Sequence, residues 1–166
     1  MKKELSVVFP IYEFENKTYI LMGKQAPGKK LAGFRNGYGG KCEPGESTLF
    51  CAKRELEEEL KLGEKYRMHI SCEDFEKVGT VLQDDKQIDF FIVRLSDMIL
   101  PPTDNSEFVN TAWFDIEEKE KFVPEMLSGD DEVIASLTEY LKTKKEVEIN
   151  KTGNQELERQ TKNIYK

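Results

Sequence analysis

Short apolar runs dominate the pattern of hydrophobic and polar positions along the first two thirds of the chain. Residues 5–11 and 19–22 are apolar and β-rich, and the polar residues 13–17 between them predict a β-hairpin. Further strands are expected at residues 66–72, where apolar residues alternate, and at 75–83, 87–95 and 111–114. A loop is expected at residues 101–106.

Two segments have the spacing of amphipathic helices. Residues 47–62 form the first, with Ser47 or Thr48 as the N-terminal cap and Gly63 as the C-terminal stop. Residues 130–142 form the second, with apolar residues at 133, 134, 137 and 141. Together with the strands, these helices predict an α+β fold whose sheet is largely antiparallel.

Six glycines fall within residues 23–40, which we interpret as a functional loop region rather than a packed element. The 166 residues are enough for one domain with a real core. From about residue 143 the chain becomes polar. We therefore divide it into a domain at residues 1–142 and a polar tail at 143–166.

Charge and composition narrow the classes of function. The formal net charge of −7 argues against broad binding to nucleic acid, which needs a basic face. A small anionic substrate remains compatible, because a bound cation supplies positive charge locally. The sequence shows neither a membrane span nor a secretory signal, and its three cysteines lack metal-ligand spacing, so a cytoplasmic protein with reduced thiols is expected.

The first predicted helix concentrates acidic residues on one side. At about 100° per residue, Glu55, Glu58 and Glu59 share a face, whereas Glu57 points to the opposite side. Like charges at these spacings repel, and a hard divalent cation such as Mg²⁺ would neutralise them. The alternative is an ordinary solvated face of surface glutamates.

A longer pattern surrounds these glutamates and resembles the signature of the Nudix hydrolase family. The matching positions are Gly40, Glu46, Arg54, Glu55, Leu56, Glu58, Glu59 and Leu62, with five residues between the first two and seven between the next two. One fixed position departs, since Lys61 stands where the family has glycine. We expect Gly63 to end a slightly longer helix instead. The resemblance implies an α/β/α sandwich with a mixed, largely antiparallel sheet.

The resemblance also implies a metal site. It assigns Glu55, Glu58 and Glu59 as ligands of Mg²⁺, with Mn²⁺ as the alternative ion. A backbone carbonyl of Gly39 or Gly40 would join them.

Supporting roles follow from the same resemblance. Arg54 would orient the carboxylates, and Glu46 would brace the preceding loop against the helix. Lys24 and Lys41 are assigned to the substrate. Glu107, in a later loop, is the candidate for a further ligand or base, with an ordinary surface glutamate as the alternative; the base is either Glu59 or Glu107.

Within the family, residues 35–41 resemble the MutT-homologue branch, which hydrolyses oxidised purine nucleoside triphosphates such as 8-oxo-dGTP. Asn36, Asp130 and Asp131 would then recognise the base through hydrogen bonds. The alternative for the two aspartates is that they stabilise the N-terminus of the helix. Ser128-Gly129 replaces the Trp-Pro of that branch. A stacking wall for the base would have to come from Phe34, Phe122 or Phe9.

The expected activity is Mg²⁺-dependent hydrolysis of a nucleoside triphosphate, with release of a monophosphate and diphosphate. Nucleotide sugars, dinucleoside polyphosphates and RNA 5′ ends are alternative substrates. A non-catalytic nucleotide-binding module is the alternative from another class. The expected partner is a small nucleotide, with no stable nucleic-acid or membrane partner; the sequence leaves the oligomeric state open.

Overall fold

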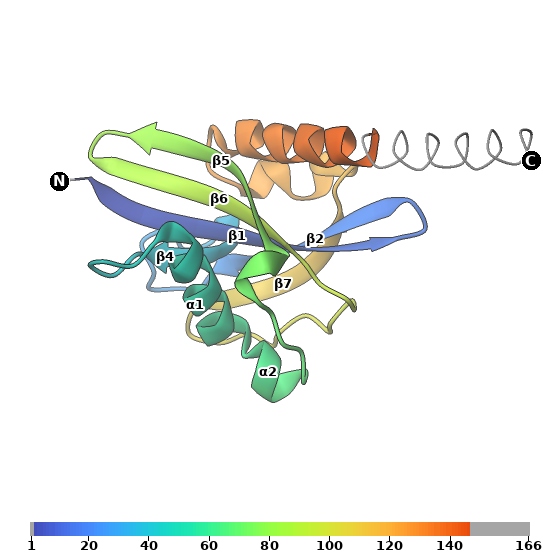
Figure 1. Cartoon of the computed structure of the whole chain (residues 1–166), viewed down its shortest axis with the longest axis horizontal. Coiled ribbons are helices and arrows are strands. Elements are labelled where there is room, and N and C mark those ends of the chain that lie inside the picture. Colours follow the sequence, from blue (N-terminus) through green and yellow to red (C-terminus); the bar gives the residue numbers. More distant parts are fainter. Residues whose placement is uncertain (1, 147–166) are drawn as a thin grey trace, which may run out of the picture. The chain divides into compact units, whose positions relative to one another are not determined.

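The computed structural model describes residues 2–146 (Figure 1). Its contacts divide the chain into two compact units, Met1–Asp131 and Glu132–Lys166, and each is considered by itself. The first unit contains the whole sheet. A helix spans residues 130–146, four residues beyond its predicted end, and the rest of the predicted tail lies outside the described residues. Within the described part of the chain, no helix is long and apolar enough to cross a membrane.

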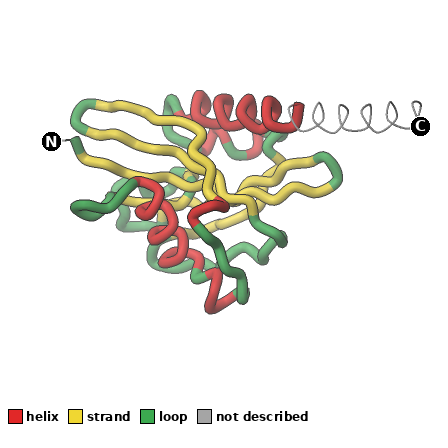
Figure 2. Tube along the Cα trace, viewed as in Figure 1, coloured by secondary structure: helices red, strands yellow, loops and turns green. Residues whose placement is uncertain are grey.

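Seven strands make one sheet in the first unit (Figure 2). They are β1 (Lys3–Phe14), β2 (Lys17–Gln25), β3 (Arg35–Asn36), β4 (Tyr38–Lys41), β5 (Phe75–Gln83), β6 (Lys86–Arg94) and β7 (Phe108–Asp115). The main path runs β3-β2-β1-β6-β5, while β4 pairs with β1 and β7 with β2. Only the β1–β6 pairing among these is parallel. The predicted α+β class with a mixed, largely antiparallel sheet is thereby confirmed.

The predicted hairpin is β1–β2, and its turn is made by Glu15 and Asn16. Both residues have positive φ, 47° and 63°, and Phe14 pairs with Lys17 across the turn. Two consecutive residues with positive φ match the right-handed twist of the flanking strands. The hairpin therefore closes in the minimal two-residue loop.

Two segments differ from the predictions. Residues 66–71 form no strand; α2 (Leu62–Lys65) precedes them and a 3-10 turn, η1 (Cys72–Asp74), follows. Their alternation is real, because Tyr66 and Met68 pack against the core, but Arg67 has a φ of 54° that breaks an extended chain. The glycine-rich segment, expected to be loop throughout, contains the short strands β3 and β4.

Helix α1 (Thr48–Leu60) is fixed to the sheet at its first turn. The Ser47 hydroxyl accepts the N–H of Phe50 at 3.2 Å and caps the helix. Thr48 Oγ1 donates to Asp89 on β6 at 2.6 Å, and Ser6 on β1 donates to the carbonyl of Thr48 at 2.6 Å. These contacts hold the start of α1 against the sheet and so determine where its acidic face points.

The last turn of α1 corrects the prediction that Gly63 ends the helix. Helix α1 stops at Leu60, and Lys61 itself adopts the left-handed conformation, with φ 50° and ψ 46°. Its N–H donates to the carbonyl of Glu57 at 2.9 Å, which closes the helix end. Lys61 therefore takes the conformation that glycine adopts more easily, at the position where the family signature has glycine.

Two short 3-10 helices, η2 (Lys119–Lys121) and η3 (Val123–Glu125), follow β7. The core beneath α1 contains Leu56, Leu60 and Tyr38, together with residues of β1, β2 and β6. Because Leu56 and Leu60 are buried, their neighbours Glu55 and Glu59 are held half-buried at the edge of the core, whereas Glu58 is exposed.

Candidate metal centre and catalytic site

One cleft of about 520 Å³ brings together four carboxylates. Glu55, Glu58 and Glu59 of α1 line it, and Glu107, from the loop before β7, lies across from them. The lining also includes Leu60, Lys61, Lys65, Pro102, Thr103, Asn105 and Ser106. The structure thus brings together the three glutamates that the helical spacing placed on one face, and adds the loop glutamate.

Glu57 lies on the other side of α1, as its position on the helix predicts. Its carboxylate forms an ion pair with Lys53 at 3.2 Å, one helical turn away. The acidic residues of this helix are therefore divided between a solvated ion pair and the cleft.

Glu59 is the most perturbed carboxylate of the cleft. Burial raises its pKa to about 9, and the negative charges of Glu55, Glu107 and Glu58 act in the same direction; a backbone hydrogen bond with Gly39 offsets part of this. Its Oε2 atom is buried and has no hydrogen-bond partner within residues 2–146. A buried, unpaired oxygen beside three like charges is costly unless a cation joins it.

Two glycines bring backbone next to these carboxylates. A Cβ on Gly40 would lie 2.7 Å from Oε1 of Glu55, and a Cβ on Gly39 would lie 1.9 Å from the carbonyl oxygen of Ser6. Neither position has room for a side chain. The absence of Cβ atoms therefore lets β4 approach both α1 and β1 closely.

Arg54 links the glycine loop to the cleft. Its guanidinium donates to both carboxylate oxygens of Glu46, at 2.8 and 3.0 Å, and to Glu55 at 2.9 Å. It also reaches Glu58 at 3.5 Å and the carbonyl of Lys41 at 3.3 Å. This arrangement fixes Glu55 and leaves the outer face of Glu58 open.

Glu46 in turn braces the loop. It accepts the N–H of Glu43 at 2.8 Å, and its hydrogen bonds with Arg54 and Glu43 lower its pKa to about 2. Burial raises the pKa of Glu55, despite the hydrogen bond from Arg54.

The residues present fit a hard divalent cation. The cleft offers carboxylate oxygens from four residues, and the Gly39–Gly40 backbone borders it. One of these oxygens, Oε2 of Glu59, is buried and has no hydrogen-bond partner within residues 2–146. Carboxylate and carbonyl oxygens are the ligands that Mg²⁺ prefers.

Lys29 belongs to this region, although no sequence pattern selected it. Its ammonium forms an ion pair with Glu107 at 2.8 Å, and the backbone N–H of Ala26 donates to the carbonyl of Glu107 at 3.0 Å. Asn105 supports the other side, because its side chain accepts the N–H of Glu107 at 2.8 Å. No local signal could have found Lys29, since its partner lies 78 residues away.

The predicted substrate residues do not line the carboxylate cleft. Lys24 forms an ion pair with Glu125 at 3.0 Å, and Lys24 and Asn36 lie on adjacent strands, where Lys24 pairs with Arg35 and Gly23 with Asn36. Because neighbouring strand residues point to opposite faces, the side chains of Lys24 and Asn36 project from different faces of the sheet. Lys41, at the end of β4, is exposed.

The two aspartates at the start of helix 130–146 differ from each other. Asp131 is exposed, whereas Asp130 is half-buried, and burial raises the pKa of Asp130 against the effect of a backbone hydrogen bond with Leu127. Asp131 adds to the increase through its negative charge.

The three aromatic residues proposed as a stacking wall differ in their exposure to solvent. Phe9 and Phe122 are fully buried, with Phe9 stacked on Phe90 and Phe122 against Phe114. Both are therefore core residues. Phe34 is 40% exposed and is the member of this set that a ligand can reach.

An α+β domain whose main helix directs three carboxylates into a cleft, next to a diglycine strand, defines a metal-dependent hydrolase. The family model for the NUDIX domain matches residues 2–137. The chain belongs to the Nudix family, whose members act on nucleoside diphosphate derivatives by cleaving phosphoric anhydride bonds with a divalent cation, typically Mg²⁺.

Several solved structures share this fold. An Ap4A hydrolase of C. elegans is 14% identical, with a TM-score of 0.57 over 85% of this chain and 98% of that one. MutT from Aliivibrio salmonicida and Vibrio cholerae is 19% identical, with a TM-score of 0.60 over 81% and 95%. The NUDIX domain of Shewanella oneidensis NrtR, complexed with ADP ribose, is 14% identical, with a TM-score of 0.59 over 85% and 89%.

These identities establish the shared fold and leave the MutT-homologue branch, as distinct from the family, a prediction. A search of curated proteins finds no match.

Proposed function

We propose that this chain is a Mg²⁺-dependent pyrophosphohydrolase of nucleoside triphosphates, oxidised purines among them, which releases a nucleoside monophosphate and diphosphate. The observation that carries the proposal is the convergence of four carboxylates in one cleft, with the buried Oε2 of Glu59 unpaired. Bound Mg²⁺ supplies neutralisation of phosphate charge and a water of lowered pKa.

The other roles in the reaction are assigned to residues of the chain. Glu55, Glu58 and Glu59 hold the cation, with the carbonyl of Gly39 or Gly40, and Arg54 keeps Glu55 in place. Glu59 or Glu107 accepts the proton of the attacking water. A bound cation would offset the burial and the neighbouring carboxylates that raise the pKa of Glu59.

Recognition of the base is assigned to Asn36 and Asp130. The Oδ1 atom of Asn36 accepts the N–H of Gly37 at 2.8 Å, which directs its amide N–H donors elsewhere. A carboxyl group whose pKa is raised by burial, like that of Asp130, can donate a hydrogen bond as well as accept one. Both features suit the altered hydrogen-bonding edge of an oxidised purine, and the exposed Phe34 offers a stacking surface.

The test is a substrate panel assayed with Mg²⁺, with and without chelator, with products separated by ion-exchange chromatography. The panel contains dGTP, 8-oxo-dGTP, a dinucleoside tetraphosphate, ADP-ribose and a 5′-triphosphate RNA. We expect 8-oxo-dGTP to be cleaved fastest, to monophosphate and diphosphate, and the chelator to stop the reaction.

A matched pair of variants assigns the base contact. Asp130→Ala should lower kcat/KM for 8-oxo-dGTP by roughly tenfold, because alanine removes both the donor and the acceptor of the carboxyl group. The exposed Asp131→Ala serves as the control. Preference for the dinucleoside tetraphosphate or ADP-ribose would be compatible with the metal site but would contradict the assigned contacts with the base. Nucleotide binding without any hydrolysis would make the chain a binding module instead.

A further inference from the structure

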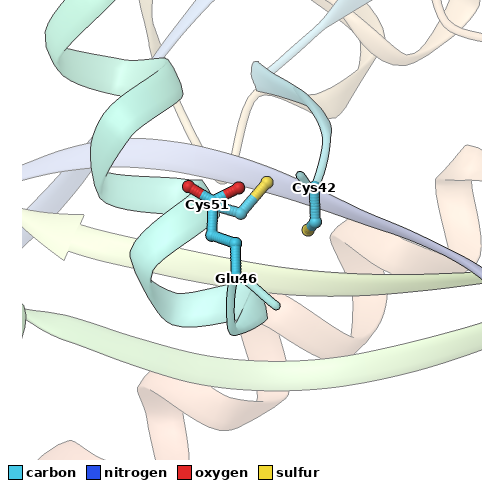
Figure 3. Close-up of side chains that lie close together, drawn as sticks. All are labelled: Cys42, Glu46 and Cys51. Atoms are coloured by element: carbon cyan, nitrogen blue, oxygen red, sulfur yellow. The ribbon is translucent and has the colours of Figure 1, made fainter. Parts of the chain in front are cut away.

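Two cysteines and a glutamate meet beside the metal centre, at the point where α1 starts next to the end of β4 (Figure 3). The Sγ atoms of Cys42 and Cys51 and a carboxylate oxygen of Glu46 all lie within 4.8 Å of one another. Cys42 is half-buried and Cys51 is fully buried. All three side chains belong to the first unit of the chain.

The surroundings favour a covalent bond between the sulfurs over a metal ion held by all three residues. Both oxygens of Glu46 are already occupied by Arg54, and one of them also accepts the N–H of Glu43. A soft cation would have to displace this ion pair. The sulfurs, by contrast, make weak contacts. The Cys42 sulfur lies 3.7 Å from the Ser6 hydroxyl, and the Cys51 sulfur lies 3.7 Å from the Gly40 carbonyl and 3.9 Å from a guanidinium nitrogen of Arg54.

We propose that Cys42 and Cys51 form a reversible disulfide when the protein meets a hydroperoxide. The peroxide oxidises the more accessible Cys42 thiol to a sulfenic acid, and the other peroxide oxygen leaves as water. The sulfur of Cys51 then attacks the Cys42 sulfur, and the hydroxyl group departs as a second water together with the thiol proton. Two thiols and one peroxide thus give one disulfide and two waters.

The bond acts on the metal centre through the backbone. A disulfide needs its sulfurs about 2.05 Å apart, whereas these Sγ atoms lie within 4.8 Å of each other, so bond formation turns the side chains and removes the thiol hydrogen bond from Cys51 to the Gly40 carbonyl. Gly40 and Lys41 directly precede Cys42; Gly40 borders Glu55, and the Lys41 carbonyl accepts from Arg54. Oxidation therefore shifts the loop that holds the carboxylates and slows hydrolysis, a link that rests on the function proposed above.

The first test needs no enzyme assay. The full chain is treated with hydrogen peroxide, denatured, alkylated with N-ethylmaleimide and digested with trypsin, which leaves both cysteines in the single peptide 42–53 and Cys72 in another. We expect peptide 42–53 to lose about 2 Da and take up no label, since a disulfide lacks two hydrogens and two free thiols. Dithiothreitol should restore two labels.

In the variants Cys42→Ser and Cys51→Ser, peptide 42–53 should no longer be protected from alkylation, whereas in Cys72→Ser it should remain protected. Higher acids on Cys42 with a fully labelled Cys51, or a bond to Cys72, would overturn the proposal. In the second test, peroxide should lower Mg²⁺-dependent hydrolysis by the wild type at least fivefold, reversibly, with Cys51→Ser unaffected. A formed bond with unchanged hydrolysis would disprove the link to the metal centre but leave both the disulfide and the proposed function standing.

Discussion

At the start of α1 the carboxylate of Glu46 receives two hydrogen bonds from Arg54 and one from a backbone N–H, and its pKa falls to about 2. At the end of the same helix Glu59 lies among three other carboxylates, one of its oxygens has no partner within the described residues, and its pKa rises to about 9. Both are glutamates of one sequence motif. An arginine satisfies the first carboxylate, while Oε2 of the second has no hydrogen-bond partner within residues 2–146 and could be satisfied by a cation.

This contrast distinguishes a glutamate with a structural role, Glu46, from a glutamate that we assign to the metal site, Glu59. A carboxylate compensated by an arginine holds a loop in place and needs nothing else. A carboxylate left uncompensated is costly to the fold, and such a cost is typical of a site that binds a charged ligand. The following experiments probe the two ends separately.

The largest effect is expected from Glu59→Gln, which keeps the shape of the side chain and removes its charge. Loss of a cation ligand should lower kcat/KM by roughly 100-fold or more at saturating Mg²⁺. Glu57→Gln is the matched control, since Glu57 faces Lys53 on the other side of α1. If the first variant retained at least half of the wild-type rate, Glu59 would not belong to the metal site.

The other end is tested by Arg54→Lys, which keeps the charge but not the planar fork of donors. Hydrolysis should fall by about tenfold to 100-fold and require more Mg²⁺, because Glu46 and Glu55 lose their shared anchor. Steady-state rates across a Mg²⁺ titration give both numbers. Lys53→Arg, one residue away, should behave as the wild type; equal losses in both variants would point to damage of the helix rather than of the anchor.

The pH dependence of stability should have opposite signs at the two ends. The raised pKa of Glu59 means that the metal-free folded state binds more protons than the unfolded state between about pH 4.5 and pH 9, so this residue makes stability fall as pH rises through that window. The lowered pKa of Glu46 contributes stability above its unfolded value, which is lost as pH falls toward 2.

Urea unfolding in the presence of chelator measures this difference. At pH 8, Glu59→Gln should be more stable than the wild type by at least about 1 kcal/mol, since one pKa unit corresponds to about 1.4 kcal/mol. The advantage should shrink toward pH 5 and on addition of Mg²⁺. A gain independent of pH would show that the titration of Glu59 is not its cause.

The smallest effect concerns the helix end that supports the acidic cleft. Lys61→Gly should raise the free energy of unfolding by about 1 kcal/mol, because Lys61 has a φ of 50° and glycine adopts this conformation without strain. Thermal unfolding provides the measurement. Gly63→Ala is the control and should change stability by less than about 0.5 kcal/mol, because Gly63 has no positive φ and its added Cβ would make only ordinary contacts, the nearest at 3.9 Å. A loss on Lys61→Gly would mean that contacts of the lysine side chain outweigh the strain.

Local sequence patterns were reliable where one segment determines its own structure. The hairpin at Glu15–Asn16, the strands β5 and β6 and the common face of Glu55, Glu58 and Glu59 all follow from spacing and turn chemistry. Residues 66–71 failed because their alternate burial comes from packing against the core and not from pairing in the sheet. The end of α1 was misplaced because Lys61 accepts a conformation that its residue type disfavours.

The sequence alone determined the α+β class and the acidic face of α1, since these depend on periodicity and on residues close together in the chain; the family resemblance added the glycine segment beside that face. Tertiary structure decided the rest. It brought Glu107 and its partner Lys29 to the cleft from distant loops, buried Phe9 and Phe122 in the core, and set Cys42 beside Cys51. Such contacts depend on how the sheet folds the chain back on itself. Within one motif, burial then raises the pKa of Glu59, whereas hydrogen bonds from Arg54 and a backbone N–H lower the pKa of Glu46.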